Sequence, residues 1–203
     1  MQKEYVPVEC NKIACTFYNN CHRCATEIVR MREEDPAIDI MFIGQGAGAQ
    51  EDANGRPFQG PAGKLLRQKV KPLLETHQLN IILDNTIRSR PLDENGKNRA
   101  PTDKELTFCL DFVWQRIETY KPTWIIPLGS SATASMLPDT KGLPIGSVRG
   151  RDYNRNGYKF LPTYHPAAIL HCSEQERKGM LEAVMCGDIA KICNSISFNS
   201  NLL

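Results

Sequence analysis

The sequence lacks several features that would assign it to a specialised class. It has no apolar run long enough to cross a membrane, and its N-terminus has no hydrophobic signal region. It has no internal repeat, no low-complexity stretch and no large excess of one charge, since the formal net charge is +2. These absences argue against a membrane protein or a repeat array, and such a small net charge does not require a polyanionic partner. We therefore expect a cytoplasmic protein that does not associate with membranes.

What the chain does contain is typical of an ordinary globular protein. Its 203 residues are 41% hydrophobic and 24% charged, which is enough to bury a core in one domain. The basic residues gather in two segments, and such clusters could either follow a phosphate backbone or be solvated loop charges. These residues are Arg88, Arg90, Lys97 and Arg99 in the first segment, and Arg149, Arg151, Arg155 and Lys159 in the second.

Eight cysteines are many for an intracellular chain, and four of them lie within residues 1–30. Cys21 and Cys24 form a CxxC pair, with Cys10 and Cys15 shortly upstream. This spacing favours a metal site, and zinc and an iron–sulfur cluster both suit thiolate ligands; buried free thiols are the alternative. We therefore interpret residues 1–30 as a cysteine-rich, metal-binding segment and residues 31–203 as a single domain.

Strand and helix patterns alternate along that domain. Apolar runs predict strands at 38–43, within 80–90 where the run ends in polar residues, at 123–129, and within 159–166 where the strand runs into a loop. Residues 143–160 resemble a hairpin with its turn at 154–157. Helical spacing predicts helices at about 61–76, 102–120, 130–137 and 173–195, the second starting with a capping box of Thr102 and Glu105. The alternation predicts an α/β fold with three α/β/α layers around a central, mainly parallel four-stranded sheet.

The chain is organised around a glycine-rich loop, Gly44 to Gly63, which follows the first of these strands. In a parallel sheet the polar strand ends near Gly44, Asn85, Gly129 and His165 converge at one edge, where ligands bind. We expect a cleft there that suits a planar heterocycle, with an aromatic platform, an amide and an imidazole. Its residues are Gln45, Glu51, Phe58, Asn85 and His165, although each alone is more often a core, turn or loop residue.

Four stretches, together with CHRC, resemble the family 4 uracil-DNA glycosylases, the iron–sulfur branch of that superfamily. They are GQGAGAQEDANGRPFQGPAG, NTIRSRP, RAPTDKELTFCLDF and YHPAAIL, and the resemblance covers roughly residues 20–195. It implies a monomeric DNA repair enzyme that flips uracil out of single- or double-stranded DNA and hydrolyses its N-glycosidic bond, leaving an abasic site.

The resemblance also implies roles for individual residues. Gly44, Gly46, Phe58 and Asn85 bind the substrate, with Phe58 stacking on uracil and Asn85 reading its O4 and N3 edge. His165, Gln45 and Glu51 are the expected catalytic residues. His165 stabilises the uracil anion and Glu51 lies near C5 of the base. Gln45 replaces the glutamate of the family's GEAPG motif, and it can orient a water but cannot accept a proton.

The same resemblance implies a 4Fe–4S cluster. Cys21, Cys24 and Cys109 match three of the family's four ligands, and Ser89 occupies the position of the fourth. We expect Cys15 to replace it; Cys10, a site of the four N-terminal cysteines alone, zinc, or no metal are alternatives. The changes around Gln45 and Gly46 leave two other functions open: an enzyme acting on a modified uracil or thymine, or a non-catalytic uracil- or DNA-binding module.

Overall fold

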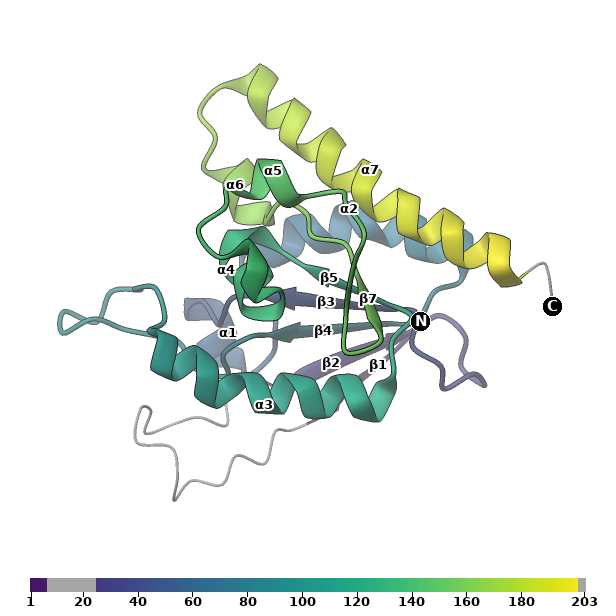
Figure 1. Ribbon diagram of the computed structural model, residues 1–203, viewed down its shortest axis with the longest axis horizontal. Coiled ribbons are helices and arrows are strands. Elements are labelled where there is room, and N and C mark those ends of the chain that lie inside the picture. Colours follow the sequence, from purple (N-terminus) through teal and green to yellow (C-terminus); the bar gives the residue numbers. More distant parts are fainter. Residues whose placement is uncertain (7–24, 201–203) are drawn as a thin grey trace.

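The computed structural model describes residues 1–6 and 25–200, which form three layers with a sheet in the middle (Figure 1). Four strands are parallel to one another in the order β4-β3-β5-β7. They are β3 (Ile40–Gly44), β4 (Ile81–Asn85), β5 (Trp124–Pro127) and β7 (Tyr158–Phe160). These are the strands that the apolar runs predict, and the expected three-layer α/β fold with a parallel core is confirmed.

The sheet is wider than the four strands expected. β1 (Gln2–Val6) and β2 (Thr26–Arg30) extend it beyond β4, and β6 (Tyr153–Arg155) closes its other edge, all three in antiparallel pairs. Both described ends of the segment 1–30 thus pair in the sheet. The predicted hairpin turn is present, with Asn156 and Gly157 at φ 54° and 83° between β6 and β7. The hairpin is shorter than expected, because its first part forms the helix α5 (Ile145–Val148).

Each face of the sheet packs against helices. α2 (Pro61–His77) and α7 (Gln175–Ser200) cover the face to which Ile40 and Phe42 point. α3 (Asp103–Tyr120) and α4 (Gly129–Met136) cover the other, where Met41 and Ile43 are buried. Alternate residues of β3 therefore enter opposite cores, which is why its sequence is apolar at every position. No helix in the described part of the chain is both long and apolar enough to span a bilayer.

The predicted capping box at the start of α3 is confirmed. The Thr102 hydroxyl accepts the Glu105 amide at 3.3 Å, and the Glu105 carboxylate accepts the Thr102 amide at 2.6 Å. The shorter elements are α1 (Ala49–Asn54), a 3₁₀ turn at Pro138–Thr140 and α6 (Pro166–Leu170). α1 and α6 lie at the carboxyl ends of the parallel strands.

The order of the strands locates the ligand site. β4 pairs on one side of β3, and the next strand in the chain, β5, pairs on the other. The loops that leave β3 and β5 therefore diverge to opposite sides, which opens a crevice at the carboxyl end of β3. Hydrogen bonds extend the parallel pairing past the strand ends, from Thr86 N to Gly44 O and from Thr163 N to Pro127 O. They bring the segments after all four parallel strands together.

Candidate functional site

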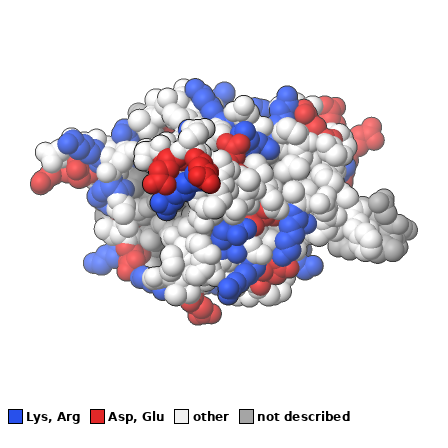
Figure 2. All heavy atoms as spheres, turned by 90° about the horizontal axis from the view of Figure 1, so that it is seen from above, with Lys and Arg blue, Asp and Glu red and all other residues white. Residues whose placement is uncertain are grey.

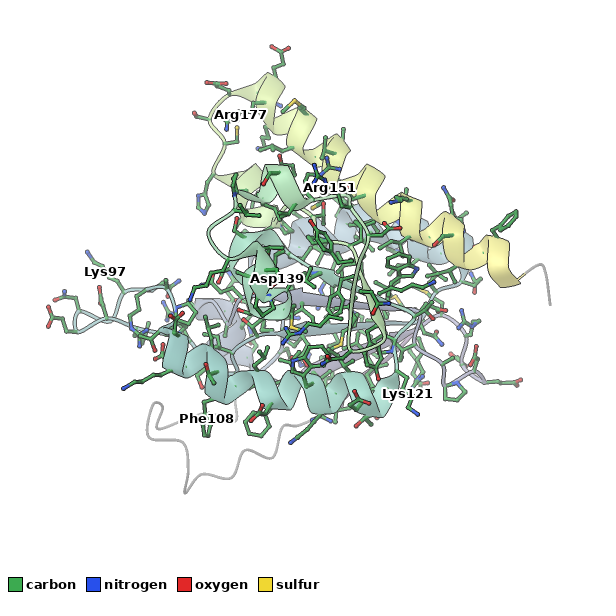
Figure 3. All side chains as sticks on the ribbon, viewed as in Figure 1. Lys97, Phe108, Lys121, Asp139, Arg151 and Arg177 are labelled. Carbon is green, nitrogen blue, oxygen red and sulfur yellow. The ribbon has the colours of Figure 1, made fainter. Side chains whose placement is uncertain are left out.

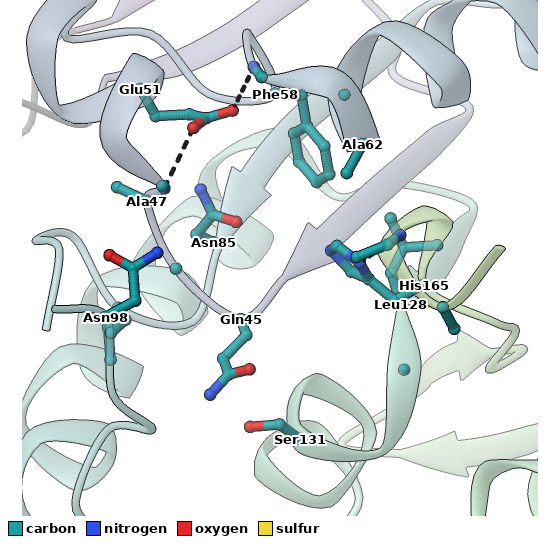
Figure 4. A pocket seen from close by; sticks show the side chains of 18 of the residues that line it. Gln45, Ala47, Glu51, Phe58, Ala62, Asn85, Asn98, Leu128, Ser131 and His165 are labelled. Carbon is teal, nitrogen blue, oxygen red and sulfur yellow. Dashed lines mark hydrogen bonds between the residues drawn. The ribbon is translucent and has the colours of Figure 1, made fainter. Parts of the chain in front are cut away.

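A cavity of about 700 Å³ opens at this crevice. Its wall combines residues from the ends of all four parallel strands and from the glycine-rich loop (Figure 4). Six residues singled out in the sequence line it, namely Gln45, Gly46, Glu51, Phe58, Asn85 and His165. Gly44 lies immediately behind them, at the end of β3. The structure thus brings the predicted cleft residues together.

Phe58 presents its ring to this cavity from a turn between α1 and α2. The residue is 5% exposed, and its backbone is left-handed, with φ 54°. That conformation is rare for a residue with a side chain. Gly63 makes it possible for the turn to sit on the start of α2, since a Cβ there would lie 2.1 Å from the Phe58 carbonyl oxygen.

Asn85 ends β4 and places its amide beside the ring. Gly44 allows this close approach: a Cβ on Gly44 would lie 2.4 Å from Asn85 Oδ1 and 3.0 Å from Phe58 Cζ. Behind the pocket, Asp84 accepts the Asn85 backbone amide at 2.7 Å and forms a buried ion pair with Arg88. The amide side chain therefore projects from a backbone that is fixed on the opposite side.

His165 caps α6 and lies across the cavity from Asn85. Its Nδ1 accepts the backbone N–H of Ala167 at 3.1 Å, so the neutral ring carries its proton on Nε2. Removal from bulk water lowers the pKa of His165 to about 4, against the opposing charge of Glu51. At neutral pH the cavity therefore contains an uncharged imidazole with one N–H donor available.

Glu51 is buried on the wall, and its carboxylate is already engaged. One oxygen accepts the Gly60 amide at 2.7 Å and the other accepts the Gly48 amide at 3.1 Å (Figure 4). These two bonds close the glycine-rich loop on itself. The family resemblance implies a position for Glu51 near the base, and the structure adds that its carboxylate braces the loop.

Gln45 extends from the end of β3 into the cavity (Figure 4). Its backbone carbonyl accepts the Thr86 hydroxyl at 2.7 Å and the Ile87 amide at 3.1 Å. The next residue, Gly46, packs against Ile87, because a Cβ on Gly46 would lie 2.6 Å from Ile87 Cγ1. The backbone is thus fixed, while the Gln45 side chain faces the cavity.

Sequence reasoning missed several lining residues. Ser130 and Ser131 follow β5, and Tyr164 precedes His165, so the strand-end argument could have found all three. Asn98 comes from the loop between β4 and α3, where its side chain accepts a hydrogen bond from Arg90 at 2.6 Å. No local signal in the sequence distinguishes Asn98 from the rest of that loop.

Most of the clustered basic residues have protein partners. Arg88 is completely buried against Asp84, and Arg149 pairs with Asp188. Arg155 stacks on Trp114. Lys97 and Arg151 are exposed, with Lys97 on the far part of the loop before α3 (Figure 3). Figure 2 shows basic and acidic side chains interspersed on one face of the molecule. The complete burial of Arg88 against Asp84 excludes that residue from contact with phosphates, which corrects the expectation for it.

The predicted metal ligands divide between two parts of the chain. Cys15, Cys21 and Cys24 lie outside the described residues, as does Cys10. Cys109 is buried in α3, and Ser89 is buried after β4 with a hydroxyl that has no hydrogen-bond partner among the residues that the structure describes. Within residues 1–6 and 25–200, no group of three or more histidine, cysteine or acidic side chains could hold a metal.

Comparisons with known proteins identify the family of the chain. The chain matches the model of the uracil DNA glycosylase superfamily over residues 31–186. It is 38% identical to a type-4 uracil-DNA glycosylase of Saccharolobus solfataricus over 68% of the chain and 34% identical to one of Sulfurisphaera tokodaii over 67%. These matches span 65% and 63% of the two relatives. A type-4 enzyme of Thermotoga maritima is 31% identical over 92% of the chain and 95% of its own length. The chain therefore belongs to the uracil-DNA glycosylase superfamily, and within it to the type-4 family.

Proposed function

We propose that this protein removes uracil from DNA by hydrolysing the N-glycosidic bond, leaving an abasic site for repair. The observation that carries the proposal is the meeting of Phe58, Asn85 and a neutral His165 in one cavity. Removal of a pyrimidine base requires an aromatic ring that stacks on the base, an amide that recognises its hydrogen-bonding edge, and an N–H donor that stabilises the base as it leaves. The family membership agrees with the same activity.

Uracil is selected by the Asn85 amide. Its N–H₂ donates to O4 and its carbonyl oxygen accepts the N3–H, while the Phe58 ring stacks on the base. Cytosine offers an amino donor where uracil has O4, so two donors would face each other. A base inside a duplex cannot reach this depth, and uracil must therefore be flipped out or met in a single strand.

His165 stabilises the leaving group. As the bond between C1′ and N1 breaks, the electron pair moves into the ring and charge develops on O2, to which Nε2–H donates. A preorganised donor of this kind is worth about 2.7–4 kcal/mol in the transition state. The bond from Ala167 to Nδ1 keeps the proton on the side that faces the base.

Water completes the reaction at the sugar. Its oxygen adds to the electron-poor C1′, its proton passes to surrounding water, and the uracil anion later takes a proton on nitrogen. Gln45 orients this water through its side-chain carbonyl, without accepting the proton. Glu51 shapes the wall near C5 by holding the glycine-rich loop, because both of its oxygens are used by backbone amides.

DNA is the partner, and the enzyme acts on it inside the cell as a monomer. Arg90, Lys97 and Arg151 are the basic residues of the two clusters best placed to contact phosphates, since Arg88 and Arg149 are occupied by carboxylates. The affinity for DNA should therefore depend only weakly on salt concentration, because few phosphate contacts are made.

Segment 1–30 supplies three of the four proposed metal ligands, and α3 supplies the fourth. Cys15, Cys21, Cys24 and Cys109 are the proposed set for a 4Fe–4S cluster, which suits four thiolates. Ser89 is the less suitable ligand, and its unpartnered hydroxyl marks the place after β4 where the family has a cysteine. When bound, the cluster supplies iron–thiolate bonds that tie the N-terminal segment to α3, and it takes no part in the steps above.

The test is excision from matched oligonucleotides that carry uracil, cytosine or thymine at one position. The proposal predicts alkali-labile sites at uracil alone, and their loss in His165→Ala and Asn85→Ala. Tight binding without abasic sites would instead indicate a binding module. A protein–DNA adduct, or excision of a C5-substituted uracil in preference to uracil, would indicate the altered chemistry that Gln45 leaves open.

A further inference from the structure

We propose that Arg67, oriented by the buried Glu27, is a positioning residue that holds the Phe58 ring where the base stacks. This inference rests on the proposed function for the role of Phe58. Neither Arg67 nor Glu27 is among the described residues that line the cavity. Their effect on a substrate must therefore pass through the turn that carries the ring.

That turn needs external support. Phe58 is left-handed, with φ 54°, and a residue with a side chain is strained in that conformation. The turn persists only if its surroundings determine it. Its carbonyl group lies against the start of α2, where Gly63 leaves just enough space.

Arg67 supplies the support from the second turn of α2. Its Nε donates to the Phe58 carbonyl at 3.2 Å, and one terminal nitrogen donates to the Pro57 carbonyl at 3.0 Å. One guanidinium thus fixes two successive carbonyl groups, at the residue that carries the ring and at the residue before it. A flexible ammonium group could not reproduce this planar fork.

Glu27 fixes the orientation of that guanidinium. Its side chain is completely buried near the start of β2, and both oxygens accept from Arg67, at 2.8 and 2.7 Å. A bidentate pair of this kind is geometrically specific, and the buried carboxylate cannot be left without it. Lys3 lies 3.9 Å away and is half-exposed, so it is the weaker partner.

The other end of the turn is held independently. Glu51 accepts the Gly60 amide at 2.7 Å. Residues 57–60 are therefore clamped by a cation that holds carbonyls on one side and by an anion that holds an amide on the other. Removing Arg67 releases one clamp and leaves the other in place, so the ring should move while the loop stays closed.

The experiment compares Arg67→Met, Arg67→Lys and Glu27→Gln with Lys71→Met in the full-length protein. Lys71 lies one turn further along α2, in an exposed ion pair with Glu75, and serves as the matched control. Three quantities are measured at a temperature where every variant is folded: the single-turnover excision rate, inhibition by free uracil, and hydrogen exchange of the peptide that contains residues 57–60.

We expect Arg67→Met to slow excision by on the order of 10–100-fold, because displacing a positioned group by about 1 Å has effects of that size. Free uracil should inhibit it more weakly, and residues 57–60 should exchange faster. Arg67→Lys and Glu27→Gln should show smaller changes in the same direction, and Lys71→Met should match the wild type.

The proposal is overturned if folded Arg67→Met keeps the wild-type rate and uracil inhibition, or if it loses stability while uracil inhibition is unchanged. If Arg67→Met does not fold, Glu27→Gln decides by the same criteria. If the wild type excises no uracil, the proposed function fails, and hydrogen exchange still decides whether Arg67 holds the turn. Unchanged exchange at 57–60 in that case overturns the positioning role as well.

Discussion

The state of His165 predicts how excision depends on pH. The perturbation is a change from pH 7.5 to pH 5. With a pKa of about 4 in the folded protein, about 90% of the molecules still contain neutral imidazole at pH 5. With the ordinary value of 6.5, about 3% would. The account therefore predicts a rate that changes by about 10%, where an ordinary histidine would give a loss of about 30-fold.

Protonation should abolish the role of His165 for a structural reason. An imidazolium has a proton on both nitrogens, so Nδ1 can no longer accept the Ala167 amide. The assay is single-turnover excision with saturating enzyme, which separates the chemical step from DNA binding. A profile that falls with a midpoint near 6.5 would refute the reasoning, whereas a flat profile down to pH 5 supports it.

The remaining predictions concern stability and the metal. Because the pKa of His165 is lower in the folded than in the unfolded protein, the unfolded chain binds more protons between pH 6.5 and 4. The free energy of unfolding should therefore fall by up to about 3 kcal/mol as the pH is lowered from 6.5 to 4. In urea titrations His165→Asn should make the free energy of unfolding less dependent on pH, and an unchanged dependence would contradict the prediction. Glu51→Gln leaves one of two backbone amides without its acceptor and should destabilise by about 1–3 kcal/mol in urea, so an equal midpoint argues against the brace. Arg88→Met leaves the buried Asp84 carboxylate without its cationic partner and should lower the free energy of unfolding by about 3–5 kcal/mol, and adding Asp84→Asn should recover part of this loss. A loss of stability below about 1 kcal/mol would be inconsistent with a buried ion pair. Cys15→Ala should lose iron and visible absorbance, and full iron content would rule out Cys15 as a ligand.

Local patterns predicted the parallel core of the fold. β3, β4 and β5 are buried at every position and begin with apolar runs, and this is the pattern of strands buried on both faces. β2 was not predicted because it contains Glu27, and glutamate is usually found on the surface. Its burial depends on Arg67, forty positions along the chain, and a contact at that separation leaves no local signal. β2 could not be predicted for that reason.

The site was predicted by a topological rule more than by single residues. Convergence of strand ends placed Gln45, Phe58, Asn85 and His165 in one cleft, and the cavity contains all four. The engagement of Glu51 was not predictable, since its backbone partners depend on how the loop folds. The expected phosphate contact of Arg88 is excluded by its burial, because its partner Asp84, four residues earlier, occupies a buried position of β4.

Release of free uracil tests the central claim most directly. Wild-type protein is incubated with a uracil-containing oligonucleotide, and free base and abasic sites are both quantified. The account predicts one uracil released per abasic site, with release lost in His165→Ala and Asn85→Ala proteins that remain folded. DNA binding without released uracil, or release that survives both substitutions, would contradict it.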